Sequence, residues 1–128
     1  MKALIDTSSF LWFIGGSEKL SKNARDFMEN FDNELFMSVV SLWEIGIKIS
    51  INKLELAEPF DTFISQKIKE NDLTVLPIEL PHISQMMKLP FHHPDPFDRL
   101  IIAQSIAEQL PIIGCDGFFK SYDIDIIW

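Results

Sequence analysis

The sequence has little that would tie it to an oxidising compartment or to a membrane. Its single cysteine, Cys115, excludes an internal disulfide and fits a reducing compartment, where we expect it to be a small buried hydrophobic residue. No apolar run is long enough to cross a bilayer, and the apolar residues before Asp6 are too few for the core of a secretory signal peptide. We therefore expect a soluble, cytoplasmic protein with no membrane partner.

Basic residues are also scarce. Lys and Arg together number 11 against 19 Asp and Glu, which gives a formal net charge of -8. Because phosphate backbones are bound mainly through Lys and Arg, this balance argues against holding nucleic acid by bulk charge. Any action on nucleic acid would then require local basic residues, a bound cation, or both.

What the chain does contain is enough apolar material for a packed core. It has 128 residues, of which 47% are hydrophobic, and this composition excludes a disordered tail. No linker, repeat or low-complexity segment interrupts the pattern. We therefore predict one domain that spans residues 1–128.

Short apolar runs alternate with longer stretches of helical periodicity along the whole chain. This alternation is typical of βαβ units, in which helices cover both faces of a parallel sheet, so we predict an α/β sandwich. The helix over 39–51 is apolar around most of its circumference, which predicts burial on two sides. The predicted strands are 2–5, 35–38, 73–76, 111–115 and 124–127, and the predicted helices are 10–14 (capped by residues 7–9), 21–31, 39–51, 59–68, 81–89 and 95–110, with a short turn or helix at 118–119.

Four acidic residues occupy positions that a parallel sheet would bring together. Asp6 and Asp116 directly follow predicted strands, Glu44 lies in the helix after the second strand, and Asp98 lies in the first turn of the helix that leads into the fourth. Ligands of open parallel sheets bind beyond the carboxyl ends of the strands, where the strand order reverses. If the first and fourth strands are neighbours, all four carboxylates can meet at this edge.

The cost of such a cluster points to a metal ion. Two carboxylates about 5 Å apart repel by roughly 3 kcal/mol at an effective dielectric near 20, and four carboxylates multiply the pairwise terms. A hard divalent cation such as Mg²⁺ offsets this repulsion, and it can activate water and stabilise charge on a phosphoryl group. The pattern therefore predicts metal-assisted phosphodiester hydrolysis.

Each of these acids also has a purely structural explanation. Asp6 can cap the following helix, and Asp116 can form an Asx-turn. Asp98 lies at the third position of its helix, where a carboxylate favours the positive end of the helix dipole. Glu44 can form a surface ion pair with Lys48 at i, i+4 spacing.

The loop that precedes the last long helix allows further alternatives. Asp95 is predicted to be the N-cap of that helix. A zinc site made of His92, His93 and Asp95 is one alternative, although a His pair before a proline is more often solvated. Arg99 and Lys48 are candidate contacts for a phosphate, or partners that offset the acids.

Four segments in this order resemble PIN-domain ribonucleases, and among them the VapC-like toxins of bacterial and archaeal toxin–antitoxin pairs. The two longer segments are specific, whereas the first and last would be weak alone. They are residues 4–8 (LIDTS), 41–48 (SLWEIGIK) with 53–56 (KLEL), 92–105 (HHPDPFDRLIIAQS) and 115–119 (CDGFF).

This resemblance implies a three-layer α/β/α fold with a five-stranded parallel sheet, and an endoribonuclease that depends on Mg²⁺ or Mn²⁺ and acts on RNA. It assigns Asp6, Glu44, Asp98 and Asp116 to the acidic metal site. It also implies a homodimer and a cognate antitoxin that lies across apolar helices near the site.

Two positions depart from the family pattern, and two other functions remain open. Gly114 stands where the family often has Thr or Ser, so a hydroxyl group near Asp116 is missing. Asn52 stands where Gly is frequent, but Asn tolerates the same left-handed backbone. The alternatives are a catalytically silent PIN scaffold that only binds a partner, and a receiver-like domain that accepts a phosphoryl group.

Overall fold

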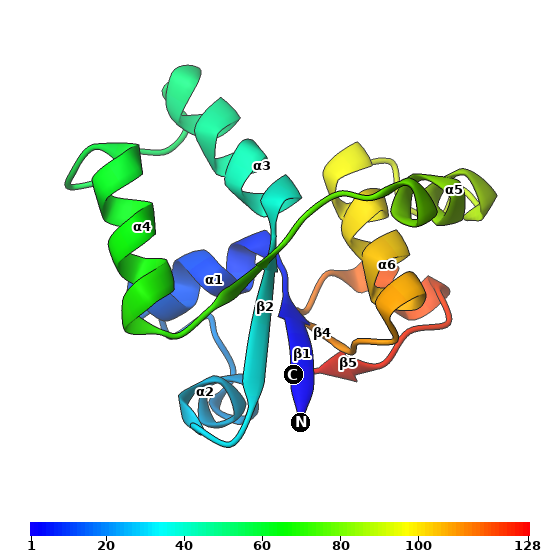
Figure 1. Ribbon diagram of the computed structural model, residues 1–128, viewed down its shortest axis with the longest axis horizontal. Coiled ribbons are helices and arrows are strands. Elements are labelled where there is room, and N and C mark those ends of the chain that lie inside the picture. Colours follow the sequence, from blue (N-terminus) through cyan, green and yellow to red (C-terminus); the bar gives the residue numbers. More distant parts are fainter.

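The computed structural model describes residues 1–128 and has five strands in one parallel sheet (Figure 1). The strand order is β3-β2-β1-β4-β5, so the strand order reverses between β1 and β4. Strands β1 and β4 are therefore neighbours, which was the condition for bringing the four acids together. Their register places Leu4 beside Ile112 and Ile5 beside Ile113. The strands are β1 (Lys2–Ile5), β2 (Glu34–Ser38), β3 (Thr74–Leu76), β4 (Ile112–Ile113) and β5 (Ile126–Ile127).

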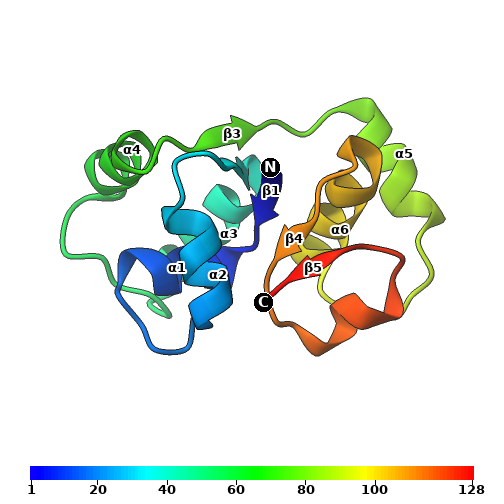
Figure 2. The ribbon, with the colours of Figure 1, turned by 90° about the horizontal axis from the view of Figure 1, so that it is seen from below.

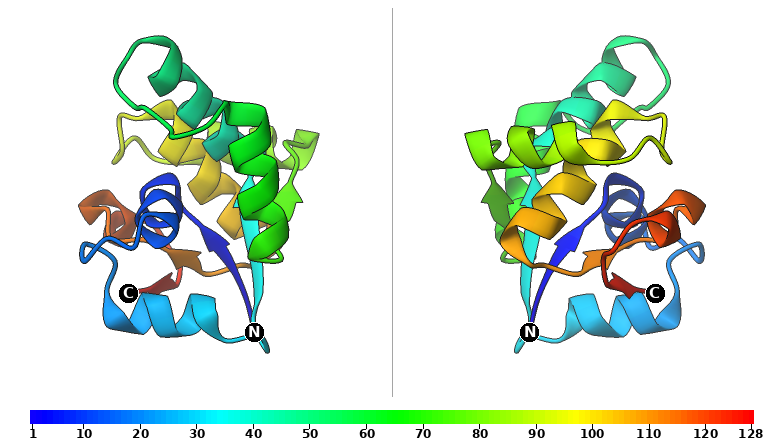
Figure 3. Two further views of the ribbon diagram at one scale, coloured as in Figure 1. Left: turned by 90° about the vertical axis from the view of Figure 1, so that its left-hand side faces the viewer. Right: turned by 90° about the vertical axis from the view of Figure 1, so that its right-hand side faces the viewer.

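Helices cover both faces of this sheet, which confirms the predicted α/β sandwich. Figures 2 and 3 show α1, α2 and α4 on one side of the strands and α5 and α6 on the other. The helices are α1 (Thr7–Ile14), α2 (Lys22–Glu29), α3 (Val39–Ser50), α4 (Phe60–Glu70), α5 (Leu80–Lys88) and α6 (Pro96–Glu108), with a short 3-10 helix, η1 (Gly117–Ser121). None of these helices combines the length and apolar composition needed to cross a bilayer.

The central strand β1 contributes to two separate apolar cores. Ala3 and Ile5 face the cluster formed with α1, α2 and α4, whereas Leu4 faces the cluster formed with α6. Successive side chains of a strand point to opposite faces, and both faces are covered here, so the strand is a continuous apolar run. Helix α3 lies between the two cores, with Ile45 in the first and Val40 in the second.

Two expectations about burial were wrong. Trp43 on α3 is 60% exposed, so α3 has one unpartnered apolar side instead of two buried ones. Cys115 is exposed, because it lies in the turn that leaves β4 at the edge of the sheet.

Helix caps and strand ends account for most differences in element boundaries. Ser21 and Asp95 cap their helices as predicted, but α1 is capped by Asp6, whose Oδ1 accepts a hydrogen bond from Ser9 N at 2.8 Å, and not by residues 7–9. The last strand is shorter than predicted because it pairs only with β4, which itself has only two residues.

Candidate active site

The four predicted acids line one cavity of about 340 Å³ at the carboxyl ends of β1 and β4. Asp6 follows β1 and Asp116 follows β4, whereas α3 contributes Glu44 and the first turn of α6 contributes Asp98. The cavity therefore lies at the reversal of strand order, where ligands of parallel sheets bind. Its remaining lining residues are Thr7, Ser8, Trp12, Lys48, Asp95 and Cys115.

Asp6 is a helix cap and a buried acid at once. It is only 6% exposed, and burial raises the pKa of its carboxyl group from 3.8 to about 6. The hydrogen bonds with Ser9 lower this pKa, and the nearby charges of Asp116 and Glu44 raise it. Capping alone would favour the charged form, so the raised pKa shows that burial and like charges outweigh the cap.

Gly114 is required by the position of Asp6. A Cβ atom at residue 114 would lie 2.8 Å from Asp6 Cγ and 2.8 Å from Phe119 Cε2, and closer still to Asp6 Oδ2. Such approaches are far inside van der Waals contact. The structure therefore has no room at this position for the Thr or Ser that is frequent in the family, unless Asp6 moves.

We expect Gly114→Ala to displace Asp6 and to lower both stability and divalent-cation affinity. Overpacking of a buried position typically costs about 1–3 kcal/mol, and the displaced carboxylate would no longer face the cavity. Thermal unfolding and Mn²⁺ titration calorimetry would measure the two effects. Gly117→Ala is the matched control, since a Cβ atom there meets nothing within 4 Å. Unchanged Mn²⁺ affinity in Gly114→Ala would show that the close approach does not position Asp6.

Asp98 has the second raised pKa of the site. Burial is the largest cause and, with the charges of Asp95, Glu44 and Asp116, it raises the pKa from 3.8 to about 7 against an opposing effect of His93. A carboxylate at this helix position normally gains from the helix dipole. Here burial and the crowding of acids outweigh that gain.

Glu44 is held by partners on both of its oxygens. Oε1 accepts a hydrogen bond from Thr7 Oγ1 at 2.7 Å, and Oε2 lies 3.2 Å from Lys48 Nζ, so the i, i+4 ion pair forms as predicted. The Thr7 hydroxyl also lies 2.8 Å from Ser41 Oγ. Thr7 and Lys48 thus fix the direction of the Glu44 carboxylate at the rim of the cavity.

His93 was not predicted to belong to this site. It was expected to be solvated, yet it is 4% exposed, and its Nε2 lies 3.0 Å from Asp116 Oδ2 and 3.1 Å from Asp98 Oδ2. His92 is exposed and packs edge-on against Tyr122, so the two histidines and Asp95 do not form the alternative zinc site. The signal available in the sequence was only the closeness of His93 to Asp95 and Asp98 along the chain.

Arg99 does not face the cavity. It is 4% exposed, and its guanidinium group donates hydrogen bonds to the carbonyl oxygens of Pro90, Met86 and Leu89, with the ring of Phe91 4.0 Å away. Arg99 therefore joins α6 to the end of α5, and Lys48 is the basic side chain that lines the cavity.

The free oxygens of the cluster suit a hard divalent cation. Ser9 N donates to Asp6 Oδ1, and His93 Nε2 lies 3.1 Å from Asp98 Oδ2, whereas Asp6 Oδ2 and Asp98 Oδ1 have no hydrogen-bonding partner in the protein. Mg²⁺ and Mn²⁺ prefer carboxylate oxygens and water as ligands. The donor chemistry and the two raised pKa values therefore fit such an ion.

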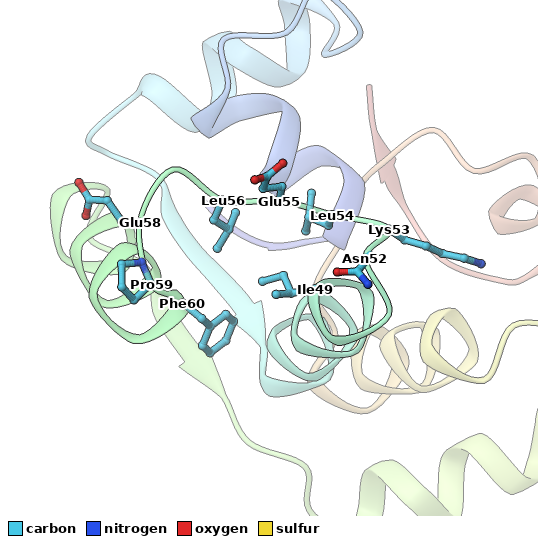
Figure 4. Close-up of a pocket in the computed structure, with 9 residues that line it drawn as sticks. All are labelled: Ile49, Asn52, Lys53, Leu54, Glu55, Leu56, Glu58, Pro59 and Phe60. Carbon is cyan, nitrogen blue, oxygen red and sulfur yellow. The ribbon is translucent and has the colours of Figure 1, made fainter.

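Two other features of the surface lack this chemistry. The cluster of Glu79, His82 and Glu108 is structural, because Glu79 N donates to His82 Nδ1 at 3.0 Å and His82 Nε2 lies 2.9 Å from Glu108 Oε1, so both ring nitrogens have partners. Figure 4 shows a second hollow between α3 and α4, with Leu54 and Leu56 toward its apolar floor and Glu58 on its outer rim. It is lined by only two acidic residues, Glu55 and Glu58, and by no histidine or cysteine.

Comparisons with known proteins agree with this fold. A family model described as the PIN domain matches residues 3–125. The chain therefore belongs to the PIN-domain family, and the receiver-like alternative is set aside. No curated protein matches the sequence.

Three solved structures share the fold across nearly the whole chain at low identity. The chain is similar to VapBC2 from Rickettsia felis bound to a DNA fragment from its promoter (TM-score 0.73, 16% identity, 98% of this chain and 97% of that one). It is also similar to VapBC-5, a member of the VapBC family of toxin–antitoxin systems, from Mycobacterium tuberculosis (TM-score 0.64, 18% identity, 98% of this chain and 97% of that one). The third is FitAcB from Neisseria gonorrhoeae (TM-score 0.68, 12% identity, 100% of this chain and 97% of that one).

Proposed function

We propose that this chain is a divalent-cation-dependent endoribonuclease and the toxin of a toxin–antitoxin pair. The observation that carries the proposal is the convergence of Asp6, Glu44, Asp98 and Asp116 on one cavity, two of them with raised pKa values. Proteins of the PIN family are generally nucleases, and the structural neighbours come from toxin–antitoxin systems. The proposal treats residues 1–128 as a single PIN domain.

The residues that line the cavity would have two roles: the acids bind the cation, and Lys48 contacts the substrate. Asp6 and Asp98, with Asp116 and Glu44, would hold Mg²⁺ or Mn²⁺, which when bound stabilises charge on the phosphodiester and lowers the pKa of a water molecule. Lys48 Nζ lies at the rim beside Glu44 and is 40% exposed on its side chain, so it is placed to contact a phosphate of the substrate. This local cation compensates for the acidic surface, and no covalent intermediate with the protein is required.

RNA cleavage with and without metal tests the proposal. We expect cleavage of transfer or ribosomal RNA in Mg²⁺ or Mn²⁺, none in EDTA, and a loss of at least about 10³-fold in Asp6→Asn, because several kcal/mol of charge stabilisation depend on the ion. The Asn oxygen can still accept the hydrogen bond from Ser9 N, which preserves the helix cap. Cleavage that persists in Asp6→Asn or in EDTA would contradict the proposal, and no cleavage of any RNA would favour the silent scaffold.

The proposal includes an antitoxin that covers the apolar side of α3 and a homodimer of the toxin. The support is a shallow apolar groove on α3, the helix that also carries Glu44, where the exposed ring of Trp43 packs edge-on against Phe97 at 5.1 Å. A complex with the cognate antitoxin that forms equally well with Trp43→Ser would place the antitoxin elsewhere. The groove is lined by Val39, Leu42, Trp43, Gly46, Ile47, Ser50 and Phe60.

A further inference from the structure

His93 lies between two of the acids and is held through both its ring and its main chain. Its Nε2 is within 3.1 Å of one oxygen each of Asp98 and Asp116, and its ring lies 4.7 Å from the ring of Phe118. The main chain at His93 is fixed as well, because its N–H donates to Tyr122 Oη at 2.9 Å and that hydroxyl donates to the Pro90 carbonyl at 2.8 Å.

The other ring nitrogen decides which role His93 can have. His93 Nδ1 lies 3.1 Å from the backbone N–H of Asp95. A backbone N–H can only donate, so Nδ1 must accept this hydrogen bond and carry no proton. In the neutral ring the proton is then on Nε2, which points at the two carboxylates and has no lone pair for a metal ion.

The partners of the two acids differ in number. The Asp116 carboxylate is also held through Oδ1, which accepts a hydrogen bond from Phe118 N at 2.8 Å. The Asp98 side chain has His93 as its only hydrogen-bonding or ion-pairing partner in the protein. His93 Nε2 is thus the one polar group of the protein that approaches the Asp98 carboxylate this closely, 3.1 Å from Oδ2, and Asp98 Oδ1 has no such partner.

We infer that His93 is a positioning residue of the metal site: it donates Nε2–H to Asp116, packs the same nitrogen against Asp98 Oδ2, leaves Asp98 Oδ1 to the cation, and is not itself a ligand. This inference rests on the proposed function. It goes further because it names the loop with His93 and Asp95 as the segment that positions Asp98 and Asp116. Asp95 serves twice in that loop, because its N–H fixes the His93 tautomer and its Oδ1 caps α6 through Phe97 N and Asp98 N.

Nitrogen-15 NMR of the ring of the wild-type protein tests the role of donor directly. We expect a protonated Nε2 and an unprotonated Nδ1 for His93 near neutral pH, both in EDTA and with saturating Mg²⁺. A ligand would give the opposite result, with Nε2 losing its proton when the cation is added. That outcome would overturn the inference while leaving a metal-dependent nuclease intact.

Substitutions test the positioning of the carboxylates through metal affinity, measured by Mn²⁺ titration calorimetry. We expect His93→Leu to weaken Mn²⁺ binding by about 10–100-fold, the usual effect of losing a hydrogen-bonding partner of a ligand. His93→Gln keeps an N–H donor near Nε2 and should recover part of the loss. Thermal unfolding of both variants in EDTA would report whether they fold.

The outcomes separate this inference from the proposed function. Wild-type protein that binds Mn²⁺ but cleaves no RNA would contradict the nuclease proposal and leave the His93 assignment in force. A folded His93→Leu variant with the Mn²⁺ affinity of the wild type would overturn the inference alone. Wild-type protein without measurable Mn²⁺ or Mg²⁺ binding would overturn both.

Discussion

Asp98→Asn is expected to abolish metal-dependent cleavage and at the same time to stabilise the metal-free protein. Burial and three neighbouring acids raise the pKa of Asp98 to about 7, so the folded state carries a free-energy cost whenever this group is ionised at neutral pH. Replacing the carboxylate by an amide removes that cost. It also removes a favourable interaction with the helix dipole, which is worth about 0.3–1 kcal/mol.

The balance favours stabilisation. The raised pKa of Asp98, discounted because the carboxyl group is partly solvated, corresponds to about 1–3 kcal/mol of destabilisation. Urea unfolding in EDTA would measure the difference, and cleavage assays in Mg²⁺ would measure the expected loss of activity. Asp61→Asn is a matched control, since Asp61 also lies in the first turn of a helix but is exposed on α4. Destabilisation of Asp98→Asn in EDTA would mean that Asp98 is a helix cap and not part of a cation site.

The metal-free protein is expected to lose stability as the pH rises from about 4 to about 7. The pKa values of Asp6 and Asp98 are raised from 3.8 to about 6 and about 7, so the folded state holds protons that the unfolded chain has already released. A folded state that binds more protons is stabilised at low pH, and this contribution disappears as the pH passes through the folded pKa. The slope is at most about 1.4 kcal/mol per proton for each pH unit.

Saturating Mg²⁺ should reverse this dependence, because the cation binds the ionised carboxylates and competes with protons. Melting temperatures between about pH 5 and about pH 8, in EDTA and in Mg²⁺, would measure both slopes. The comparison with Asp98→Asn isolates the contribution of Asp98 and of its interactions with neighbouring acids, since groups outside the cavity titrate equally in both proteins. Parallel pH profiles of wild type and Asp98→Asn in EDTA would contradict the assigned cause.

Local signals in the sequence predicted the framework of the site. Apolar runs that end at Asp6 and just before Asp116 place these acids at strand ends, and Asp95 followed by Pro96 marks the start of the helix that carries Asp98. The positions of strand ends and helix starts depend on the periodicity of apolar residues and on helix capping, both of which act over a few residues. The parallel sheet then follows from the alternation of strands and helices.

Only the tertiary structure determined how the acids are oriented and what surrounds them. The His93 ring packs against Phe118 and Phe119 of η1, and Tyr122 just after η1 accepts a hydrogen bond from the His93 main chain; no local pattern encodes these contacts. Gly114 matters because Asp6 from another strand occupies the space where a side chain would stand. The helix over 39–51 was expected to be buried on two sides and Cys115 to be buried, yet Trp43 and Cys115 lie exposed, since burial depends on which segment packs over a position. Sequence periodicity thus placed the carboxylates at one edge of the sheet, whereas contacts between distant segments set their partners and pKa values, because desolvation and hydrogen bonding depend on neighbours in space.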